Sequence, residues 1–175
     1  MSAPASLALI QMHGEPGSGK TTIARALAPC IPAIHLDKDV VMTAIMEASI
    51  PRELAGPASY ESMRAVARGI LQQGQSVILD SPAFWPIIES SARGLANESG
   101  ATFLMIECRC QNKHEIDRRL ATRERLPTHP RERHDWLAVP GTCEPGSRRL
   151  VLDTTLPVEK NVCRALQYVH DGGRE

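Results

Sequence analysis

The sequence predicts an α/β fold of three layers, in which a five-stranded parallel sheet carries helices on both faces. Short apolar segments alternate along the chain with longer segments of helical periodicity, a pattern typical of parallel strands joined by helices. A glycine-rich turn directly follows the first apolar segment, and aspartates end two later ones. Because parallel strands all end at the same edge of their sheet, we expect these groups to lie together.

Five strands are expected where short apolar runs occur, at Leu7–Met12, Ala33–Asp37, Ser76–Asp80, Thr102–Cys108 and Arg149–Thr154. Helices are expected to begin near Lys20, Val40, Pro57, Pro86 and Asn112, and a last one to cover Pro157–His170. The prolines suit helix starts because the missing N–H would have no partner there. Gly74 and Gly100 are expected to follow helix ends.

One segment departs from this alternation. Residues 126–147 contain four prolines and show no clear periodicity. A segment of this length without regular structure is usually functional when it lies inside a compact chain. We therefore expect residues 119–147 to form a small lid over the site, within a single domain of residues 1–175.

The composition excludes several classes of function. Lys and Arg total 20, as do Asp and Glu, so the formal net charge is zero and a nucleic-acid partner is not expected. The five cysteines include no Cys-x-x-Cys pair, which argues against a disulfide framework or a zinc site. No apolar segment is long enough to cross a bilayer, so we expect a cytoplasmic protein without a membrane partner. Monomer and homodimer both stay open.

The segment GEPGSGKT, Gly14 to Thr21, fits the pattern G-x-x-x-x-G-K-[ST]. In such a loop the backbone N–H groups converge on phosphate, and the following helix points its positive end at the same anion. Lys20 would reach the β- and γ-phosphates, and the Thr21 hydroxyl would bind Mg²⁺. The loop therefore predicts a nucleoside triphosphate site and the P-loop NTPase fold. Its contacts are expected from Gly14, Glu15, Pro16, Gly17, Ser18, Gly19, Lys20, Thr21 and Thr22.

Carboxylates follow two of the expected strands. Asp37 and Asp39 lie at the end of the second strand, and Asp80 ends the third. A kinase needs a carboxylate that accepts the proton of the acceptor hydroxyl, and often another beside Mg²⁺. Asp39 is the better placed base, whereas Asp80 could hold a magnesium-bound water. Either Asp37 or Asp39 could instead cap the following helix.

Four segments, GEPGSGKTTIARALA, HLDKDVVMTAI, GQSVILDSP and RRLATRERL, together resemble the small P-loop kinases. That family includes gluconate kinase, adenylylsulfate kinase, the 5′-kinase domain of phage polynucleotide kinase and chloramphenicol phosphotransferase. The resemblance covers most of the chain and implies ATP as the nucleotide. It also implies that Asp39 is the catalytic base and Asp37 an outer acidic position.

The resemblance further implies that Arg119 lies against adenine and that Arg123 reaches the phosphates as the lid closes. An arginine fork is well suited to the charge that develops on a transferring phosphoryl group. The alternative is a solvated helix face on which these arginines pair with Asp117 and Glu124.

The acceptor pocket is the least determined part. Several relatives with phosphate- or sulfate-bearing acceptors have an arginine three residues after the base, where this chain has Met42. The segment VVMTAIM would give the pocket an apolar wall suited to an uncharged acceptor, although it could equally pack into the core. Further candidate contacts are Tyr60, Arg64, Phe84 and Trp85. The aromatic residues Phe84 and Trp85, in the segment SPAFW, could instead pack in the core or cover it.

The leading interpretation is an ATP- and Mg²⁺-dependent kinase that phosphorylates a hydroxyl of a small molecule, such as an antibiotic or other natural product. Lys20, Asp39 and Arg123 would carry the transfer. A nucleoside or polynucleotide 5′-hydroxyl kinase is an alternative, which the zero net charge disfavours. An ATP-binding switch that docks a partner is another, and it would bind ATP without turnover on any acceptor.

Overall fold

The computed structural model describes residues 7–83, 85–123, 126–128 and 148–174. At its centre lies a parallel sheet with the strand order β2-β3-β1-β4-β5. The strands are β1 (Ala8–His13), β2 (Ala33–Asp37), β3 (Ser76–Asp80), β4 (Thr102–Arg109) and β5 (Leu150–Asp153). The predicted parallel sheet is confirmed, and the expected strand bounds agree to within about one residue at either end.

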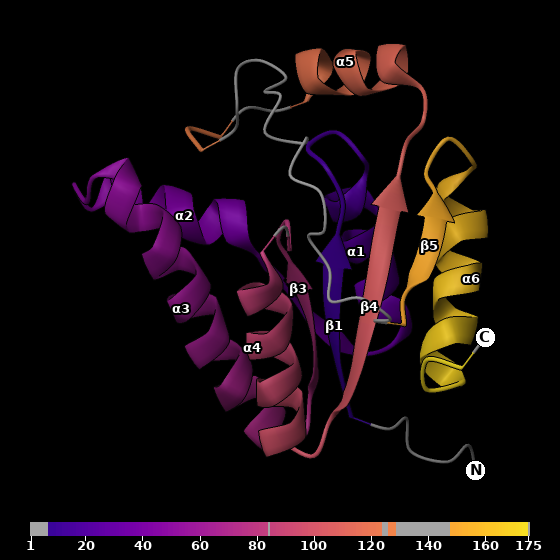
Figure 1. The fold of residues 1–175 in the computed structure, drawn as a ribbon, viewed down its shortest axis with the longest axis horizontal. Helices are drawn as coiled ribbons and strands as arrows, with labels where there is room; N and C mark the ends of the chain where they lie inside the picture. Colours follow the sequence, from indigo (N-terminus) through magenta and orange to yellow (C-terminus); the bar gives the residue numbers. More distant parts are fainter. Residues whose placement is uncertain (1–6, 84, 124–125, 129–147, 175) are drawn as a thin grey trace.

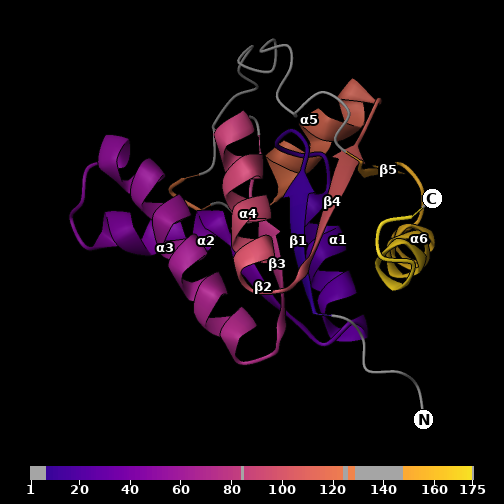
Figure 2. The ribbon, with the colours of Figure 1, turned by 60° about the horizontal axis from the view of Figure 1, so that its bottom comes forward.

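Helices cover both faces of the sheet (Figures 1 and 2). Helices α1 (Lys20–Leu27) and α6 (Val158–His170) lie on one face, and α3 (Arg52–Gln72) and α4 (Pro86–Glu98) lie on the other. Helix α2 (Lys38–Glu47) lies beside α3, and α5 (Lys113–Thr122) lies over the edge at which the strands end (Figure 1). A short 3₁₀ turn, η1 (Ala28–Cys30), follows α1. The three-layer prediction is therefore confirmed.

The central strand β1 shows why the strands are apolar throughout. Successive side chains of a strand point to opposite faces. Ile10 and Met12 accordingly pack into the core against α1 and α6, whereas Leu9 packs into the core against α3 and α4. All three are fully buried, because helices cover both faces of a parallel sheet of this kind.

Two helix starts differ from expectation. Helix α2 begins at Lys38, directly after Asp37, rather than near Val40. Helix α3 begins at Arg52, because the N–H groups of Leu54 and Ala55 already donate to the carbonyl of Pro51 at 3.0 and 2.9 Å. The proline at the start of this helix is thus Pro51, and the prediction of a start near Pro57 is wrong.

The ends of α3 and α4 follow the prediction. Gly74 and Gly100 follow these helices with φ of +76° and +65°, the left-handed backbone that glycine adopts without strain. Of the expected lid, residues 119–123 and 126–128 are described, and residues 129–147 lie outside the described residues. None of the helices within the described ranges combines the length and apolar character that a membrane span requires.

The central strand predicts a test of the fold. Ile10→Ala removes a fully buried side chain from β1, and we expect it to lower the free energy of unfolding by about 2–5 kcal/mol. Ile34→Ala, at a side chain that is 40% exposed on the edge strand β2, is the matched control and should cost about 1 kcal/mol or less. Urea denaturation of both variants measures the difference, and equal losses would contradict the described core.

Candidate nucleotide and acceptor site

A cavity of about 1350 Å³ lies at the edge where β1, β2 and β3 end. Its lining runs from the glycine-rich loop and α5 at one end to α2, α3 and α4 at the other. Clefts that hold one small ligand usually measure about 300–1,000 Å³. The cavity is therefore large enough for two ligands side by side.

The glycine-rich loop has a backbone that other residues could not adopt. Gly14 has a φ of +134°, and a Cβ placed there would lie 2.3 Å from the carbonyl oxygen of Cys108 on β4. Gly19, with a φ of +91°, precedes α1, and no side chain within the described ranges caps that helix. The first N–H groups of α1 thus face the cavity end without a side-chain cap, as a phosphate-binding helix requires.

Lys20 lies inside the curve of the loop. Its Nζ donates to the carbonyl of Glu15 at 2.9 Å, and the N–H of Ser18 donates to the same oxygen at 3.0 Å. Burial lowers the pKa of Lys20, while the carboxylates of Asp80 and Asp39 act in the opposite direction. The ammonium group is therefore held close to the position where phosphates would enter.

The loop residues divide into two groups. Those that line the cavity are Pro16, Gly17, Gly19, Lys20, Thr21 and Thr22. The predicted contacts Gly14, Glu15 and Ser18 do not line it, and they support the loop from behind. The carbonyl of Ser18, for instance, accepts the hydroxyl of Thr154, which follows β5, at 2.7 Å.

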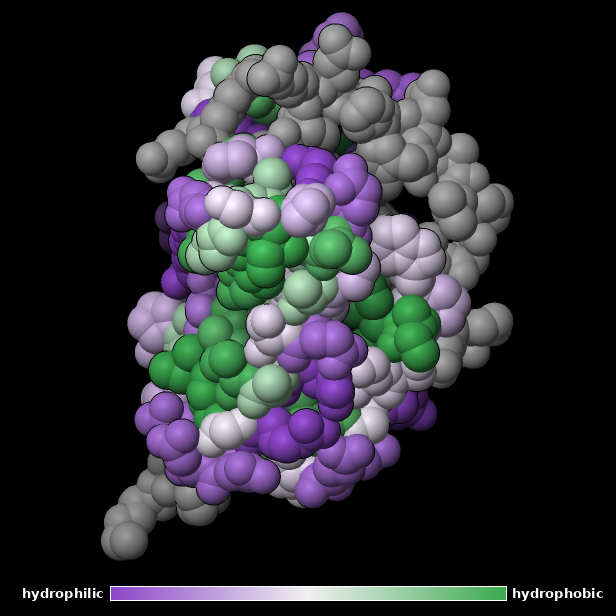
Figure 3. All heavy atoms as spheres, turned by 90° about the vertical axis from the view of Figure 1, so that its left-hand side faces the viewer, coloured by the Kyte–Doolittle hydropathy of each residue, from purple (hydrophilic) through white to green (hydrophobic). Residues whose placement is uncertain are grey.

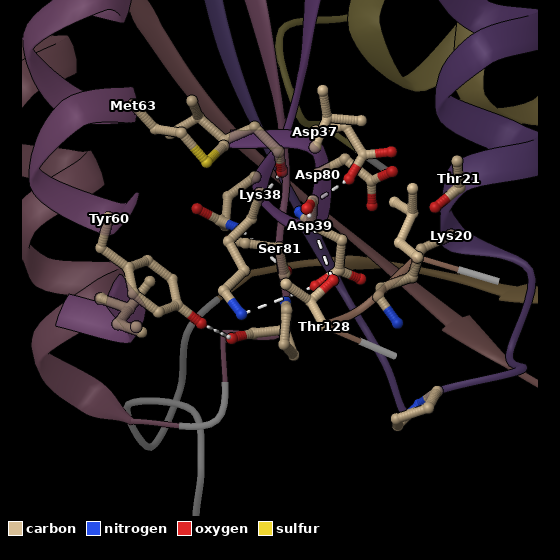
Figure 4. A pocket seen from close by; sticks show the side chains of 18 of the residues that line it. Lys20, Thr21, Asp37, Lys38, Asp39, Tyr60, Met63, Asp80, Ser81 and Thr128 are labelled. Carbon is tan, nitrogen blue, oxygen red and sulfur yellow. Dashed lines mark hydrogen bonds and ion pairs between the residues drawn. The ribbon is translucent and has the colours of Figure 1, made fainter. Parts of the chain in front are cut away.

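The two aspartates at the end of β2 and the start of α2 make separate contacts in the structure. Asp37 caps α2, because its Oδ1 accepts the N–H of Asp39 at 2.9 Å. Asp39 lies in the first turn of α2 and lines the cavity, with Lys38 Nζ at 3.6 Å from its Oδ1. Figure 4 shows Asp39 between the loop residues Lys20 and Thr21 on one side and Tyr60 on the other. The role of Asp39 as the base stays a prediction, which a position between these two groups allows.

A second carboxylate pair forms where β2 and β3 meet. Asp37 and Asp80 are register partners, and His35 Nε2 lies 3.1 Å from Asp80 Oδ2. The candidate ligand atoms of these three residues all lie within 4.8 Å of one another. Burial raises the pKa of Asp37, and the neighbouring charge of Asp80 adds to the effect. Asp37 also pairs with the exposed Arg25 at 3.6 Å.

The residues predicted to bind Mg²⁺ fit that ion by their chemistry. The Thr21 hydroxyl lines the cavity beside Lys20, and Asp80 offers a carboxylate that is 4% exposed. Hydroxyl, carboxylate and water oxygens are the ligands that Mg²⁺ prefers. His35 contacts Asp80 through Oδ2.

The arginines of α5 differ in their surroundings. Arg119 donates to the carbonyl and hydroxyl oxygens of Thr154 at 2.7 and 3.1 Å and to the carbonyl of Gly17 at 3.3 Å. It also pairs with Glu115 at 2.7 Å, and Arg118 and Arg119 together lower the pKa of Glu115 to about 2. Arg119 thereby joins α5 to the loop and to β5. Arg123 lines the cavity at the end of α5.

The predicted acceptor contacts are only partly brought together. Tyr60, Arg64 and Trp85 line the cavity, and Phe84 lies outside the described residues. Met42 is 5% exposed and packs in the interior rather than lining the cavity, so the apolar residue that α2 contributes to the cavity wall is Val40. Arg64 pairs with Glu61 at 2.7 Å. The Tyr60 hydroxyl donates to the carbonyl of Pro82 at 3.0 Å, and burial raises its pKa, so it stays protonated.

Several cavity residues were not among the predicted contacts, and they include the polar residues Lys38, Thr128 and Gln11. Lys38 lies beside Asp39, with its Nζ 5.8 Å from the centre of the Tyr60 ring (Figure 4). Thr128 lines the cavity, and its hydroxyl contacts the carbonyl of Asp39 at 3.4 Å. Gln11 of β1 lines the cavity floor. The position of Lys38 between the two aspartates of the segment DKD could have predicted its place in the cavity. No local pattern in the sequence predicts the places of Thr128 and Gln11.

The loop backbone generates one prediction. For Gly14→Ala we expect lost ATP binding and a free energy of unfolding lower by about 1–3 kcal/mol or more, because the new Cβ meets Cys108 and the φ is strained. Gly69→Ala in α3, where a Cβ meets nothing within 4 Å, is the matched control and should stabilise by about 0.5–1 kcal/mol. Calorimetric ATP titration and urea denaturation check both. Unchanged ATP affinity in Gly14→Ala would contradict the assignment of the loop.

Burial of Asp37 generates another prediction. Because the folded pKa lies above the ordinary value of 3.8, stability from this carboxyl is present at low pH and is lost as the pH rises through the folded pKa. Asp37→Asn cannot ionise but still offers a capping oxygen. We expect the variant to melt at a higher temperature than wild type at pH 7, with a difference that shrinks towards pH 3.8.

Asp153→Asn is the control, for which we expect a change in melting temperature of the opposite sign. Hydrogen bonds from Thr155 lower the pKa of Asp153, so its carboxylate contributes stability above the ordinary pKa. This variant should melt at a lower temperature than wild type at pH 7. If Asp37→Asn also melts lower at pH 7, the ion pair with Arg25 outweighs burial and the account of Asp37 is wrong.

Comparison with solved structures supports the fold. A candidate kinase from Chloroflexus aurantiacus is 22% identical over 97% of this chain and 100% of its own, with a TM-score of 0.71. A sugar kinase from Janibacter is 21% identical over 93% of this chain and 94% of its own, with a TM-score of 0.66. The APS kinase of Mycobacterium tuberculosis, solved with AMPPNP and APS, is 18% identical over 94% of this chain and 98% of its own, with a TM-score of 0.67.

No curated protein matches the sequence. The family model AAA_33, described as an AAA domain, matches residues 9–139. The chain therefore belongs to the AAA_33 family and has the fold of the small P-loop kinases.

Proposed function

We propose that the protein is an ATP-dependent phosphotransferase that moves the γ-phosphoryl group to a hydroxyl of a small molecule. One observation carries the proposal: a single cavity joins the phosphate-binding loop to a second compartment, with Asp39 between the two. A nucleotide-binding protein without an acceptor has no need of the second compartment. The kinases among the similar structures agree with this reaction class.

Residues of the cavity can carry out each step of the transfer. The loop N–H groups and Lys20 hold the β- and γ-phosphates, and Arg123 faces the same end of the cavity. Asp39 accepts the proton of the acceptor hydroxyl. The hydroxyl oxygen then forms a bond to the γ-phosphorus while the bond between that phosphorus and the β–γ bridging oxygen breaks, and ADP leaves. Bound Mg²⁺, held through Thr21 and Asp80, would supply neutralisation of charge on the phosphate oxygens.

The acceptor compartment suits a molecule without net charge. Among the residues that the structure describes, three cations line it, and each is already engaged: Lys38 with Asp39 at 3.6 Å, Arg64 with Glu61 at 2.7 Å, and Arg52 with backbone carbonyls. Apolar side chains from α2 and α4 line the same compartment. An antibiotic or another natural product with an alcohol group is an acceptor of this kind. We place the reaction in the cytoplasm, where ATP is available.

ADP release in the presence of ATP and Mg²⁺ tests the proposal. The acceptor panel spans neutral antibiotics, sugars and sugar acids, nucleosides and 5′-hydroxyl oligonucleotides. For the stimulating acceptor we expect Asp39→Asn to lower the rate by about 10²–10⁴-fold, because the general base is lost, while ATP affinity stays within about twofold. Asp117→Asn, at an exposed aspartate of α5, is the matched control and should retain the wild-type rate.

Two outcomes would contradict the proposal. If ATP binds and no acceptor stimulates ADP release, a switch that docks a partner replaces it. If only 5′-hydroxyl oligonucleotides stimulate release, the protein is a polynucleotide kinase.

A further inference from the structure

The acceptor compartment continues into a recess between the sheet and the helices α3 and α4. One wall comes from α4, where the cavity-lining residues recur at the spacing of a single helix face. The opposite wall comes from α3, and the floor comes from β1 and β3. The recess is formed by Gln11, Met63, Leu79, Ile88, Ala92 and Leu95.

The recess has an apolar interior and an apolar entrance. Met63, Leu79, Ala92 and Leu95 are at most 7% exposed, and they belong to the core packed on this face of the sheet. At the entrance, Trp85 and Ile87 also line the cavity and are 53% and 71% exposed. Figure 3 shows that hydrophobic side chains gather in separate groups on the side of the molecule where α2 and α3 lie. A ligand that enters the recess must therefore present apolar surface.

Gln11 is the polar exception on the floor. Leu9 faces α3 and α4, and alternation along β1 turns Gln11 to the same face, on which the core side chains are apolar. Its Nε2 lies 2.8 Å from the carbonyl of Met12, 3.3 Å from those of Leu79 and Ser81, and 3.0 Å from the Ser81 hydroxyl. Three carbonyl acceptors around one atom identify it as the nitrogen of the amide.

The oxygen of the same amide, Oε1, takes part in none of these hydrogen bonds. Oε1 is buried and finds no hydrogen-bond partner within the described part of the chain. The two atoms of an amide point in diverging directions, so the contacts of Nε2 with β3 and the following turn direct Oε1 away from them. A buried acceptor without a donor is costly, and native proteins seldom keep one without a use.

We infer that the recess binds the apolar part of the acceptor, and that Gln11 Oε1 receives a hydrogen bond from a donor at the buried end of that acceptor. This inference rests on the proposed function and names the acceptor class: an apolar, ring-sized body with the reacting hydroxyl at one end and a hydrogen-bond donor at the other. Oε1 is closed to solvent, so binding moves a flexible lining side chain such as Met63.

The register of the sheet supports this orientation. Gln11 pairs with Leu79, and the next residue of β3 is Asp80 at the strand end. Gln11 thus lies about 3.3 Å, or one strand residue, below the level of the carboxylates. A ligand that reaches Gln11 from the entrance passes the carboxylate edge, where Asp39 lines the cavity. Gln11 would select the acceptor without taking part in the transfer.

Two matched probes test the inference without ATP. The probes are 4-hydroxybenzyl alcohol, which carries a donor opposite its alcohol, and 4-methylbenzyl alcohol, which has a methyl group there. NMR titration measures the dissociation constants of both for wild type and for Gln11→Met, which keeps the length of the side chain and removes the amide. We expect wild type to prefer the hydroxyl probe, and the preference to fall by about 10-fold in Gln11→Met.

A second variant tests the recess itself and covers the case in which Gln11→Met does not fold. Ala92→Leu fills the recess from α4, and we expect it to weaken both probes by about 10-fold or more while calorimetric ATP affinity stays unchanged. Ala65→Leu makes the same change at an exposed position of α3 and should bind both probes as wild type does.

Several results would overturn the inference: an unchanged probe preference in folded Gln11→Met, no preference for the hydroxyl probe in wild type, undiminished binding in Ala92→Leu, or no binding of either probe to wild type up to its solubility limit. Because the titrations contain no ATP, failure of the proposed phosphotransferase activity leaves their outcome unaffected. Failure of the probes likewise leaves the acceptor panel to decide the activity.

Discussion

The charges gathered where β1, β2 and β3 end are the constraint on which the rest of the site depends. Parallel pairing in register places Asp37 beside Asp80, and the loop after β1 brings Lys20 to the same edge. Buried charges are costly unless each is compensated. The structure compensates them locally: Asp37 caps α2, His35 contacts Asp80, and Lys20 donates to the loop carbonyl.

This compensation also organises the cavity around the site. Both Asp37 and Asp39 line the cavity, but Asp37 is engaged as the cap of α2, whereas Asp39 lies in the first turn of that helix between the loop and the second compartment. The cap fixes the start of α2 and hence the position of Asp39 in its first turn. Lys38, one residue earlier, lies between Asp39 and the Tyr60 ring. The position of the proposed base therefore follows from a local hydrogen bond as much as from the sheet.

The sequence predicted those parts of the fold that local patterns determine. The strands follow from runs of apolar residues, and the loop follows from glycines whose positive φ values only glycine adopts without strain. The predicted start of α3 is wrong because both Pro51 and Pro57 suit the start of a helix. The backbone hydrogen bonds to the carbonyl of Pro51 show that the helix begins after Pro51. The sequence left open whether Met42 lines the acceptor pocket or packs into the core, because the direction of a helical side chain depends on tertiary packing. The contacts of Gln11 and Thr128 join segments far apart in the chain, and no sequence spacing reveals them.

The central claim is that the terminal phosphoryl group of ATP passes directly to an organic hydroxyl within one cavity. The most direct measurement uses ATP labelled in the γ-phosphoryl group and follows the label by ³¹P NMR and mass spectrometry in the presence of the acceptor. We expect the label to appear on the acceptor as a phosphate monoester, in an amount equal to the ADP formed. Label that appears only as inorganic phosphate, or that stays on ATP, would contradict the account.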